Sequence, residues 1–458
     1  MSNLPADDLA FHRWLSARLD PFKSVEPNDP DHLFVPIHEG TDHDQVSVIH
    51  REITISDSGS LNFISGFSGS GKSSELRRLK SLLEGQGYLV AMADASDYFL
   101  PTLPVSRDMF LIKMAGAYSD QLENLIGLEA LKQSYWQRLI HWLKETHVQL
   151  QGFDLDTDAG NFKVILKENP SFISQLEAHL STLPKVIEKQ VHNFFADATS
   201  AAMSKLGATY RPVFILDSFE KLQDISQDGG EVADSIMAIL ANHKEALRVP
   251  GHHVVLTMPP WIKLLSPGPG NVRLVYGVKL WTSDTKRPTY HPGMKLMREV
   301  ALRRFTQAGL DRFFGPTKGN KPHPLLDKLI KASGGHLRDF ILLLRETMLR
   351  ATLPRSEPDA PLVTSRQVNS AIANHQNSFG VLSDTALELL IRISHDRACR
   401  YPDGKNETRH TLNNLFNNRY AFFLTNAVEW CDVHPLLWEI TKLPDQPDST
   451  VSGFTPSS

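Results

Sequence analysis

Residues 61–80 read LNFISGFSGSGKSSELRRLK, and this stretch decides the fold. The short apolar run Leu61–Ser65 stands directly before a glycine-rich segment, and a sequence with helical periodicity follows. A short apolar run bounded by breakers predicts a buried strand. The segment Gly66–Ser73 fits G-x-x-x-x-G-K-[ST] at every fixed position. Strand, glycine-rich turn and helix in this order predict a phosphate-binding loop in an α/β domain; the alternative is a chance Gly/Ser loop.

The residue types in this loop suit a triphosphate. Its glycines let the backbone curl so that successive N–H groups point at phosphate oxygens, and the next helix begins there with its positive end. We expect Lys72 to place its charge between the β- and γ-phosphates and the Ser73 hydroxyl to coordinate Mg²⁺. The expected ligands are therefore ATP and Mg²⁺. The expected nucleotide-binding residues of the loop are Gly66, Ser68, Gly69, Ser70, Gly71, Lys72, Ser73 and Ser74.

A magnesium site needs a second anchor, which comes from the end of a neighbouring strand. The run RPVFILD, residues 211–217, is apolar and ends in Asp217. We expect Asp217 to hold Mg²⁺ through water, and Glu220 to polarise the water that attacks the γ-phosphate. The alternatives are a turn cap for Asp217 and a surface salt bridge to Lys221 or Lys244 for Glu220.

Another strand is predicted to end in LTMPP, residues 256–260. A small polar side chain at the end of this strand can sense the γ-phosphate, and Thr257 is the candidate. The alternative is that the Thr257 hydroxyl satisfies its own turn.

Short runs rich in Val, Ile, Leu or Phe alternate with helical periodicity, which is typical of a parallel α/β sheet. A long separation between the second and third runs, with helical periodicity throughout, predicts an inserted set of helices at about 104–210. The predicted strands are Leu61–Ser65, Tyr88–Asp94, Pro212–Asp217, His253–Thr257 and Val272–Val278.

The remaining segments predict the domain organisation. An N-terminal arm at 1–45 carries one short amphipathic helix that includes Phe11, Trp14, Leu15 and Leu19. The other predicted parts are a P-loop core at 46–315, a helical lid at 316–377, a small domain at 378–445 and a disordered tail at 446–458.

Composition excludes several other classes. The formal net charge is -4, so any contact with DNA needs a local basic patch. Cys399 and Cys431 have no zinc spacing, so no structural metal site is expected, and two isolated thiols suit a reducing cytoplasm. The start lacks the pattern of a signal peptide, and no apolar run approaches the roughly 20 residues that span a bilayer. We expect a cytoplasmic protein without a membrane partner.

Four segments together resemble the AAA+/STAND branch of P-loop ATPases, including bacterial ATPases related to origin-recognition proteins. They are GFSGSGKSSELRRLK, FILDSFEKLQD, VVLTMPPWI and SGGHLRDFILLLRE. The resemblance covers roughly residues 46–440. It implies an AAA+-like core, a helical lid and a C-terminal domain similar to a winged helix, with TALELLIRISHD and ETRHTLNNLFNNR as helices and AFFLTNAVEWCDVHPLLWEI as a β-wing with a terminal helix.

The resemblance also implies roles for three arginines. Arg338, in the first turn of a lid helix, is expected to reach the γ-phosphate; its alternative is an exposed arginine paired with Asp339 or Glu346. Arg303 and Arg304 are candidates for an arginine finger that completes the site of a neighbouring subunit, although paired arginines on a helix are also typical of a solvated face.

The chain departs from the AAA+ pattern in two places. Ser218 stands where the pattern has a glutamate directly after the aspartate, which puts the catalytic carboxylate in doubt. LTMPPW lacks the arginine that STAND proteins often carry near the end of this strand. Basic residues near the presumed recognition helix are few, so packing or protein contact competes with DNA binding there: Lys405, Arg409, His410 and Arg419.

These observations favour an ATP-hydrolysing switch that oligomerises or changes shape to control a protein partner or effector, in a prokaryotic defence or regulatory system. No nuclease, protease or other second active site appears in the sequence. The alternatives are an ATP-dependent DNA-binding loader, a nucleotide-binding scaffold without useful hydrolysis, which Ser218 would permit, and a small-molecule phosphoryl transferase.

Overall fold

The computed structural model describes residues 4–441 except 147–149, 151, 154, 156, 208–209, 220–230, 265–271, 318–320, 354–359, 401–404 and 427. The chain divides into two compact units. We call Phe22–Val275 the sheet unit, and Met1–Pro21 together with Tyr276–Ser458 the C-terminal unit.

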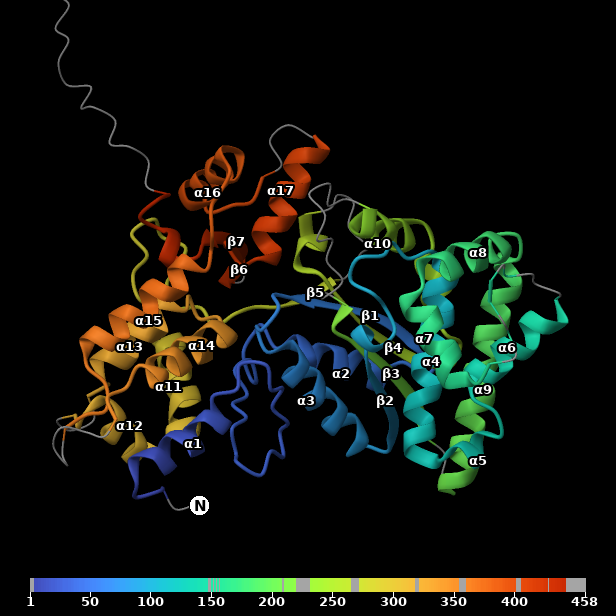
Figure 1. Ribbon diagram of the computed structural model, residues 1–458, viewed down its shortest axis with the longest axis horizontal. Helices are drawn as coiled ribbons and strands as arrows, with labels where there is room; N and C mark the ends of the chain where they lie inside the picture. Colours follow the sequence, from blue (N-terminus) through green and yellow to red (C-terminus); the bar gives the residue numbers. More distant parts are fainter. Residues whose placement is uncertain are drawn as a thin grey trace, which may run out of the picture. The chain divides into compact units, whose positions relative to one another are not determined.

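Five parallel strands form the centre of the sheet unit in the order β2-β3-β4-β1-β5 (Figure 1). All five predicted strands are confirmed, although β5 ends at Val275 rather than Val278. Because the strands are parallel, their carboxyl ends meet at one edge, which we call the carboxyl edge. The bounds are β1 Ser60–Gly66, β2 Tyr88–Asp94, β3 Arg211–Asp217, β4 His253–Met258 and β5 Val272–Val275.

Successive residues of each strand face opposite sides of the sheet, and each side has its own helices. Ile64 packs in one apolar cluster with α2 (Gln45–Ile55) and α3 (Lys72–Glu84). Phe63, the preceding residue, packs in a second cluster with the inserted helices. The predicted core begins at residue 46, and α2 begins one residue earlier, at Gln45.

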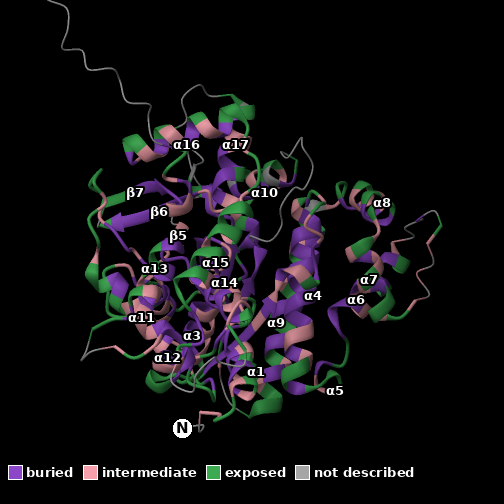
Figure 2. Ribbon diagram, turned by 60° about the vertical axis from the view of Figure 1, so that its left-hand side comes forward, coloured by how far each residue is buried: buried purple, intermediate pink, exposed green. Residues whose placement is uncertain are grey.

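The predicted insert at about 104–210 is a set of helices between β2 and β3. Its longest helices, α4 and α9, pack together, and the Tyr118 and Phe195 rings stack 4.3 Å apart between centroids. Much of α4 is buried (Figure 2). The insert is therefore part of the core and not a surface addition. The bounds are α4 Arg107–Ile126, α5 Leu128–Leu131, α6 Tyr135–Glu145, α7 Ala159–Glu168, α8 Pro170–Leu180 and α9 Pro184–Leu206; α10, Glu231–Asn242, follows β3.

The C-terminal unit begins earlier than the predicted lid. Helices α11 and α12 fall within the predicted core at 46–315, yet they belong to this unit. Packing explains the difference, because α11 contacts α13, and Phe305 of α11 and Phe313 of α12 lie 5.1 Å apart between ring centroids. Helix α1 also joins α11, since Arg18 Nε donates to the Arg304 carbonyl at 2.9 Å. The bounds are α1 Asp8–Arg18, α11 His291–Phe305, α12 Gln307–Phe314, α13 Pro324–Ala332, α14 Leu337–Leu349 and α15 Ser365–Asn377.

The last described segment consists of two helices and a hairpin. Helices α16 (Asp384–Asp396) and α17 (Asn406–Asn417) precede the antiparallel strands β6 (Ala421–Asn426) and β7 (Val428–Val433). In place of the predicted terminal helix, the described residues after β7 contain a short 3₁₀ helix, Pro435–Leu437. The winged-helix assignment stays a prediction, and the predicted tail at 446–458 lies outside the described residues. Among the helices that the structure describes, none has the length and apolar character that crossing a membrane demands.

Candidate nucleotide-binding site

The glycine-rich loop joins β1 to α3 at the carboxyl edge. Gly66, Gly69 and Gly71 all adopt positive φ angles, of 153°, 88° and 100°. At Gly66 a side chain is also sterically excluded, because a Cβ would lie 2.5 Å from the Val275 carbonyl oxygen of β5. The loop can therefore curl tightly against the neighbouring strand, as a backbone cradle for phosphate requires.

Lys72 is held inside this curl. Its Nζ donates to the carbonyl oxygens of Gly66 at 2.7 Å and Phe67 at 3.0 Å, and the residue is only 2% exposed. The fully buried Ser70 hydroxyl has no hydrogen-bond partner among the described residues. A buried ammonium group and an unpartnered hydroxyl in one loop fit an anionic oxygen ligand. Ser73, the second residue of α3, is half-buried.

The first turns of α3 are tied to the segment that precedes α2. The Val25 backbone N–H donates to Ser74 Oγ at 3.1 Å, so this predicted nucleotide contact has a partner within the sheet unit. One turn further, Arg78 Nε donates to Glu75 at 2.8 Å and its terminal nitrogen pairs with Asp44, the N-cap of α2. Burial raises the pKa of Glu75 despite the nearby guanidinium. These contacts hold the first turns of α3 in place behind the glycine-rich loop.

The end of β3 carries Asp217, as predicted. Its Oδ1 accepts from the Ser218 backbone N–H at 2.6 Å. Ser218 has a φ of 67°, an uncommon conformation for a residue with a side chain, and its hydroxyl donates to Asp94 Oδ2 at 2.8 Å. Asp94 ends β2 directly opposite Asp217 in the parallel register. Sequence reasoning missed Asp94; the available signal was that a second predicted strand, Tyr88–Asp94, also ends in an aspartate.

Thr257 lies at the same edge but is fully buried. Its hydroxyl accepts from the Phe219 backbone N–H at 2.8 Å and donates to the Leu216 carbonyl at 3.4 Å. These two bonds join Thr257 of β4 to the end of β3 and the turn that follows it. The Thr257 hydroxyl therefore does not bond within the turn that follows its own strand. The γ-phosphate contact of Thr257 stays a prediction. Glu220, the predicted general base, falls within the gap 220–230 of the described residues.

Arg338 is the second residue of α14 in the C-terminal unit, as the lid prediction requires of a first-turn residue. Its Nε donates to the Pro21 carbonyl at 3.2 Å, and its role toward the nucleotide stays a prediction. The preceding glycines permit close packing within this unit. A Cβ on Gly335 would lie 1.7 Å from the Val278 carbonyl oxygen, so no other residue fits.

The two candidate finger arginines differ in accessibility. The Arg303 side chain is 48% exposed and pairs with Glu299 at 2.8 Å on the same helix. Arg304 is buried, and one of its terminal nitrogens donates to the Val300 carbonyl at 3.2 Å. Arg303 is therefore the better placed of the two to reach another subunit, and the finger role stays a prediction for both.

Arg419, one of the four basic residues near the presumed recognition helix, has an internal partner. Its Nε lies 3.2 Å from Oδ2 of the buried Asp339. This ion pair favours packing over DNA contact at that position, because the charge of Arg419 is largely compensated inside the C-terminal unit.

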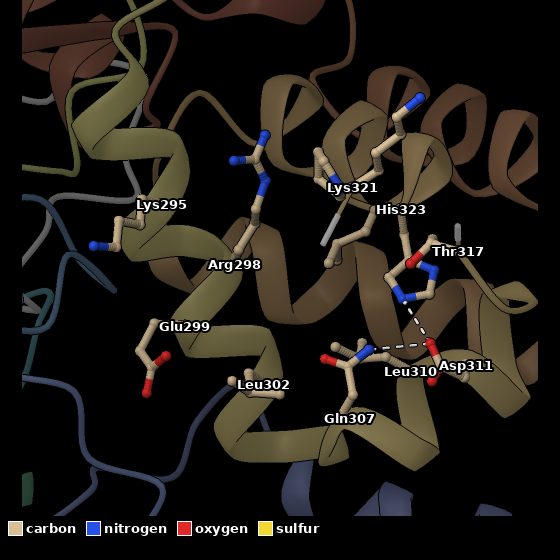
Figure 3. A pocket seen from close by; sticks show the side chains of 12 residues that line it. Lys295, Arg298, Glu299, Leu302, Gln307, Leu310, Asp311, Thr317, Lys321 and His323 are labelled. Atoms are coloured by element: carbon tan, nitrogen blue, oxygen red, sulfur yellow. Dashed lines mark hydrogen bonds and ion pairs between the residues drawn. The ribbon is translucent and has the colours of Figure 1, made fainter. Parts of the chain in front are cut away.

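A pocket of about 730 Å³ lies between α11, α12 and the start of α13 (Figure 3). Four of its charged or titratable groups, Arg298, Glu299, Asp311 and His323, are paired with one another or with neighbours. Arg298 makes two hydrogen bonds of 2.7 Å to Asp327, and His323 lies 3.2 Å from Asp311, which also accepts from Gln307 at 3.0 Å. We assign this pocket no function.

The chain is similar to several solved structures. No protein-family model matches the chain, and no curated protein matches it. The solved Aeropyrum pernix ORC2 protein, in ADPNP and ADP complexes, is 12% identical with a TM-score of 0.37, over 89% of this chain and 94% of its own. A Walker-type ATPase of Pyrococcus abyssi is 11% identical with a TM-score of 0.39, over 93% and 100%. The Aeropyrum pernix ORC1 protein, in complex with DNA, is 13% identical with a TM-score of 0.35, over 94% and 95%.

At such low identities and TM-scores, the class of the molecule is defined by its own features. The loop between β1 and α3, the five-stranded parallel sheet and the aspartate at the end of β3 define a P-loop nucleoside triphosphatase fold.

Proposed function

We propose that this chain binds ATP with Mg²⁺, hydrolyses it, and works as an AAA+/STAND-like molecular switch. The carrying observation is the buried Lys72 ammonium group inside the glycine-rich curl, with Asp217 at the end of a strand on the same edge of the sheet. A buried charge that donates to backbone carbonyl oxygens is well suited to exchange those oxygens for phosphate oxygens.

The chain's own residues divide the work of phosphoryl transfer. Ser73 and Asp217 would hold Mg²⁺, which when bound neutralises charge on the phosphates. Lys72 and the loop amides bind and orient the triphosphate. Glu220 accepts the proton of the attacking water. Asp94 is a positioning residue, because its hydrogen bond to Ser218 holds the turn next to Asp217 in place.

The proposed switch couples nucleotide to shape. Arg338 senses the γ-phosphate from the lid helix, so ATP favours a closed, oligomeric form and hydrolysis releases it. The output is contact with a protein partner or effector, in a regulatory or defence setting. The two helices and hairpin at the end of the C-terminal unit support the alternative of an ATP-dependent DNA loader.

Turnover and binding measured together test the proposal. Glu220→Gln should bind ATP with unchanged affinity but hydrolyse it at least roughly 100-fold more slowly, because the general base is lost. Glu245→Gln, a carboxylate whose side chain is 79% exposed on the same unit, is the control and should hydrolyse normally. Native turnover in Glu220→Gln would show that another group acts as the base.

Particle mass distinguishes the switch from the DNA loader. A non-hydrolysable ATP analogue should raise the mass of the native protein without DNA, and Arg338→Ala should abolish that rise. A mass that rises only when duplex DNA is added, with strong dependence on salt, would support the loader instead.

A further inference from the structure

Three side chains of the C-terminal unit converge where several of its elements meet. Asp339 and His434 are fully buried, and the His375 side chain is 11% exposed. Asp339 Oδ1, His375 Nε2 and His434 Nε2 each have no hydrogen-bond partner among the described residues. One ligand atom from each of the three residues lies within 4.8 Å of the others. Buried polar atoms of this kind normally have a partner, so the cluster requires an explanation.

The three side chains come from separate elements. Asp339 is in the first turn of α14, His375 is in the last turn of α15, and His434 follows β7. No linear spacing could therefore reveal the cluster, which is why the sequence indicated no structural metal site. His375 Nε2 lies 3.8 Å from Asp339 Oδ1, and His434 Nε2 lies 3.8 Å from Asp339 Oδ2.

The second carboxylate oxygen of Asp339 is already occupied. Its Oδ2 lies 3.0 Å from His336 Nδ1 and 3.2 Å from Arg419 Nε. Supporting hydrogen bonds to the outer oxygen of a carboxylate are typical of metal sites, because they orient the ligand and leave the other oxygen for the ion. Arg419 would serve in this way, whereas His336 Nδ1 accepts from the Asp339 backbone N–H at 3.3 Å beside the same oxygen.

We propose that Asp339, His375 and His434 bind a divalent transition metal ion of the zinc class. Two imidazole nitrogens and one carboxylate oxygen are donors that zinc accepts, whereas Mg²⁺ and Ca²⁺ prefer oxygen alone. Ligand atoms about 2.0–2.2 Å from a tetrahedral zinc ion are roughly 3.3–3.6 Å apart. The 3.8 Å between His375 Nε2 and Asp339 Oδ1 therefore needs only a small contraction, and the separations within the cluster that involve His434 are at most 4.8 Å. The fourth position is left for water or another ligand.

Both histidines can bind the ion as neutral rings, although His434 would lose one hydrogen bond. Zinc binds the neutral imidazole, and the Nε2 atoms of His375 and His434 are both without a hydrogen-bond partner among the described residues. His434 Nδ1 accepts from the Leu436 backbone N–H at 3.2 Å, and metal binding at Nε2 would move the ring proton to Nδ1 and break that bond. Losing one such bond is a modest cost beside the free energy that zinc gains from two imidazole nitrogens and a carboxylate oxygen.

The bound ion would fasten α14, α15 and the segment after the hairpin to one another. Arg338 directly precedes Asp339 on α14, so the same ion would steady the helical turn that carries the proposed γ-phosphate sensor. The metal site itself does not depend on the proposed ATPase function.

Metal content is the direct test. The full chain is produced without a polyhistidine tag in zinc-supplemented medium and dialysed against metal-free buffer. Elemental analysis should then find about one zinc per native chain, and Co²⁺ loaded into the metal-stripped protein should give the visible absorption of a tetrahedral site. His375→Ala and Asp339→Asn should both lose the zinc, the Co²⁺ absorption and any zinc-induced rise in melting temperature.

His141→Ala is the matched control. His141 and Glu145 form an exposed pair 3.1 Å apart on one helix, the kind of surface site that takes up zinc adventitiously, and this variant should keep its zinc. If Asp339→Asn does not fold, His375→Ala decides alone, since its side chain is at the edge of the cluster. Metal-free native protein that shows no Co²⁺ absorption, or zinc content unchanged in His375→Ala, would overturn the proposal in favour of an ordered water molecule or a different zinc site.

Discussion

The two edges of the central sheet both bury polar side chains, but they satisfy them differently. At the amino edge, Ser60 Oγ and His253 Nδ1 are 2.9 Å apart, and a buried chain runs from Tyr118 through Thr199 to His252 with two contacts of 2.7 Å. His252 Nδ1 then donates to the Pro250 carbonyl at 2.9 Å, so each named group has a protein partner. This edge is complete without a ligand.

At the carboxyl edge, the partners of the polar groups are ones that a phosphate ligand can replace. The Lys72 ammonium group donates to two backbone carbonyl oxygens, the Ser70 hydroxyl has no hydrogen-bond partner in the part of the chain that the structure describes, and Ser218 keeps an uncommon backbone conformation. The difference teaches that burial of polar groups alone does not mark a site. A ligand site is marked instead by buried polar groups whose protein partners a ligand can replace.

Lys72→Ala should have the largest effect. Removing the ammonium group deletes two or more charge-assisted hydrogen bonds to phosphate, so ATP affinity should fall roughly 100-fold or more, measured by calorimetry with Mg²⁺ present. Lys80→Ala is the control on the same helix, because Lys80 forms an exposed pair with Glu84 at 2.8 Å, and it should bind ATP normally. Equal affinity in Lys72→Ala and the native protein would remove the distinction between the two edges.

Asp94→Ala should affect turnover more than binding. Without this carboxylate, Ser218 loses its 2.8 Å partner and the turn beside Asp217 relaxes, so the hydrolysis rate should fall about 10-fold while ATP affinity changes less than about 3-fold. Ser218→Ala should behave similarly. Because the two residues act through one bond, the double variant should be little worse than either single variant. Additive losses would show that Asp94 acts independently of Ser218.

His253 should make the sheet unit sensitive to acid. Burial lowers the pKa of His253 to about 4, below its unfolded value near 6.5. As pH falls from about 6.5 to 4, the unfolded chain takes up the proton first, so the free energy of unfolding should decrease by about 2 kcal/mol. Chemical denaturation at several pH values should show a shallower decrease for His253→Asn, which cannot be protonated. The exposed His141→Asn should follow the native profile.

Tyr118→Phe should have the smallest effect. The substitution removes one buried hydroxyl that bonds to Thr199 at 2.7 Å, so the free energy of unfolding should drop by about 1 kcal/mol. ATP binding should not change, because the hydroxyl belongs to the internally satisfied edge. A change in affinity comparable to that of Lys72→Ala would show that the two edges are coupled.

Local patterns in the sequence predicted the strands, the loop and Asp217, because a buried strand and a glycine-rich turn are encoded by neighbouring residues. They could not predict Asp94 as the partner of Ser218, since that contact joins residues 124 positions apart. The assignment of α11 to the C-terminal unit likewise involves a long-range contact, because Arg18 of α1 bonds to Arg304 of α11, 286 positions away. The hydrogen bond of Thr257 could not be predicted for the same reason, because its partner Phe219 is 38 positions away in the sequence.

The insert between β2 and β3 limits how the molecule can be shortened. Removing residues 104–210 would not yield a minimal nucleotide-binding fragment, because the helices α4 and α9 share one apolar cluster with Phe63, Leu89 and Phe214 of three different strands. Exposing that face to water would favour aggregation over folding. Any shorter version of this chain, whether engineered or reached by evolutionary trimming, must therefore retain the insert or supply a replacement cover for that face of the sheet.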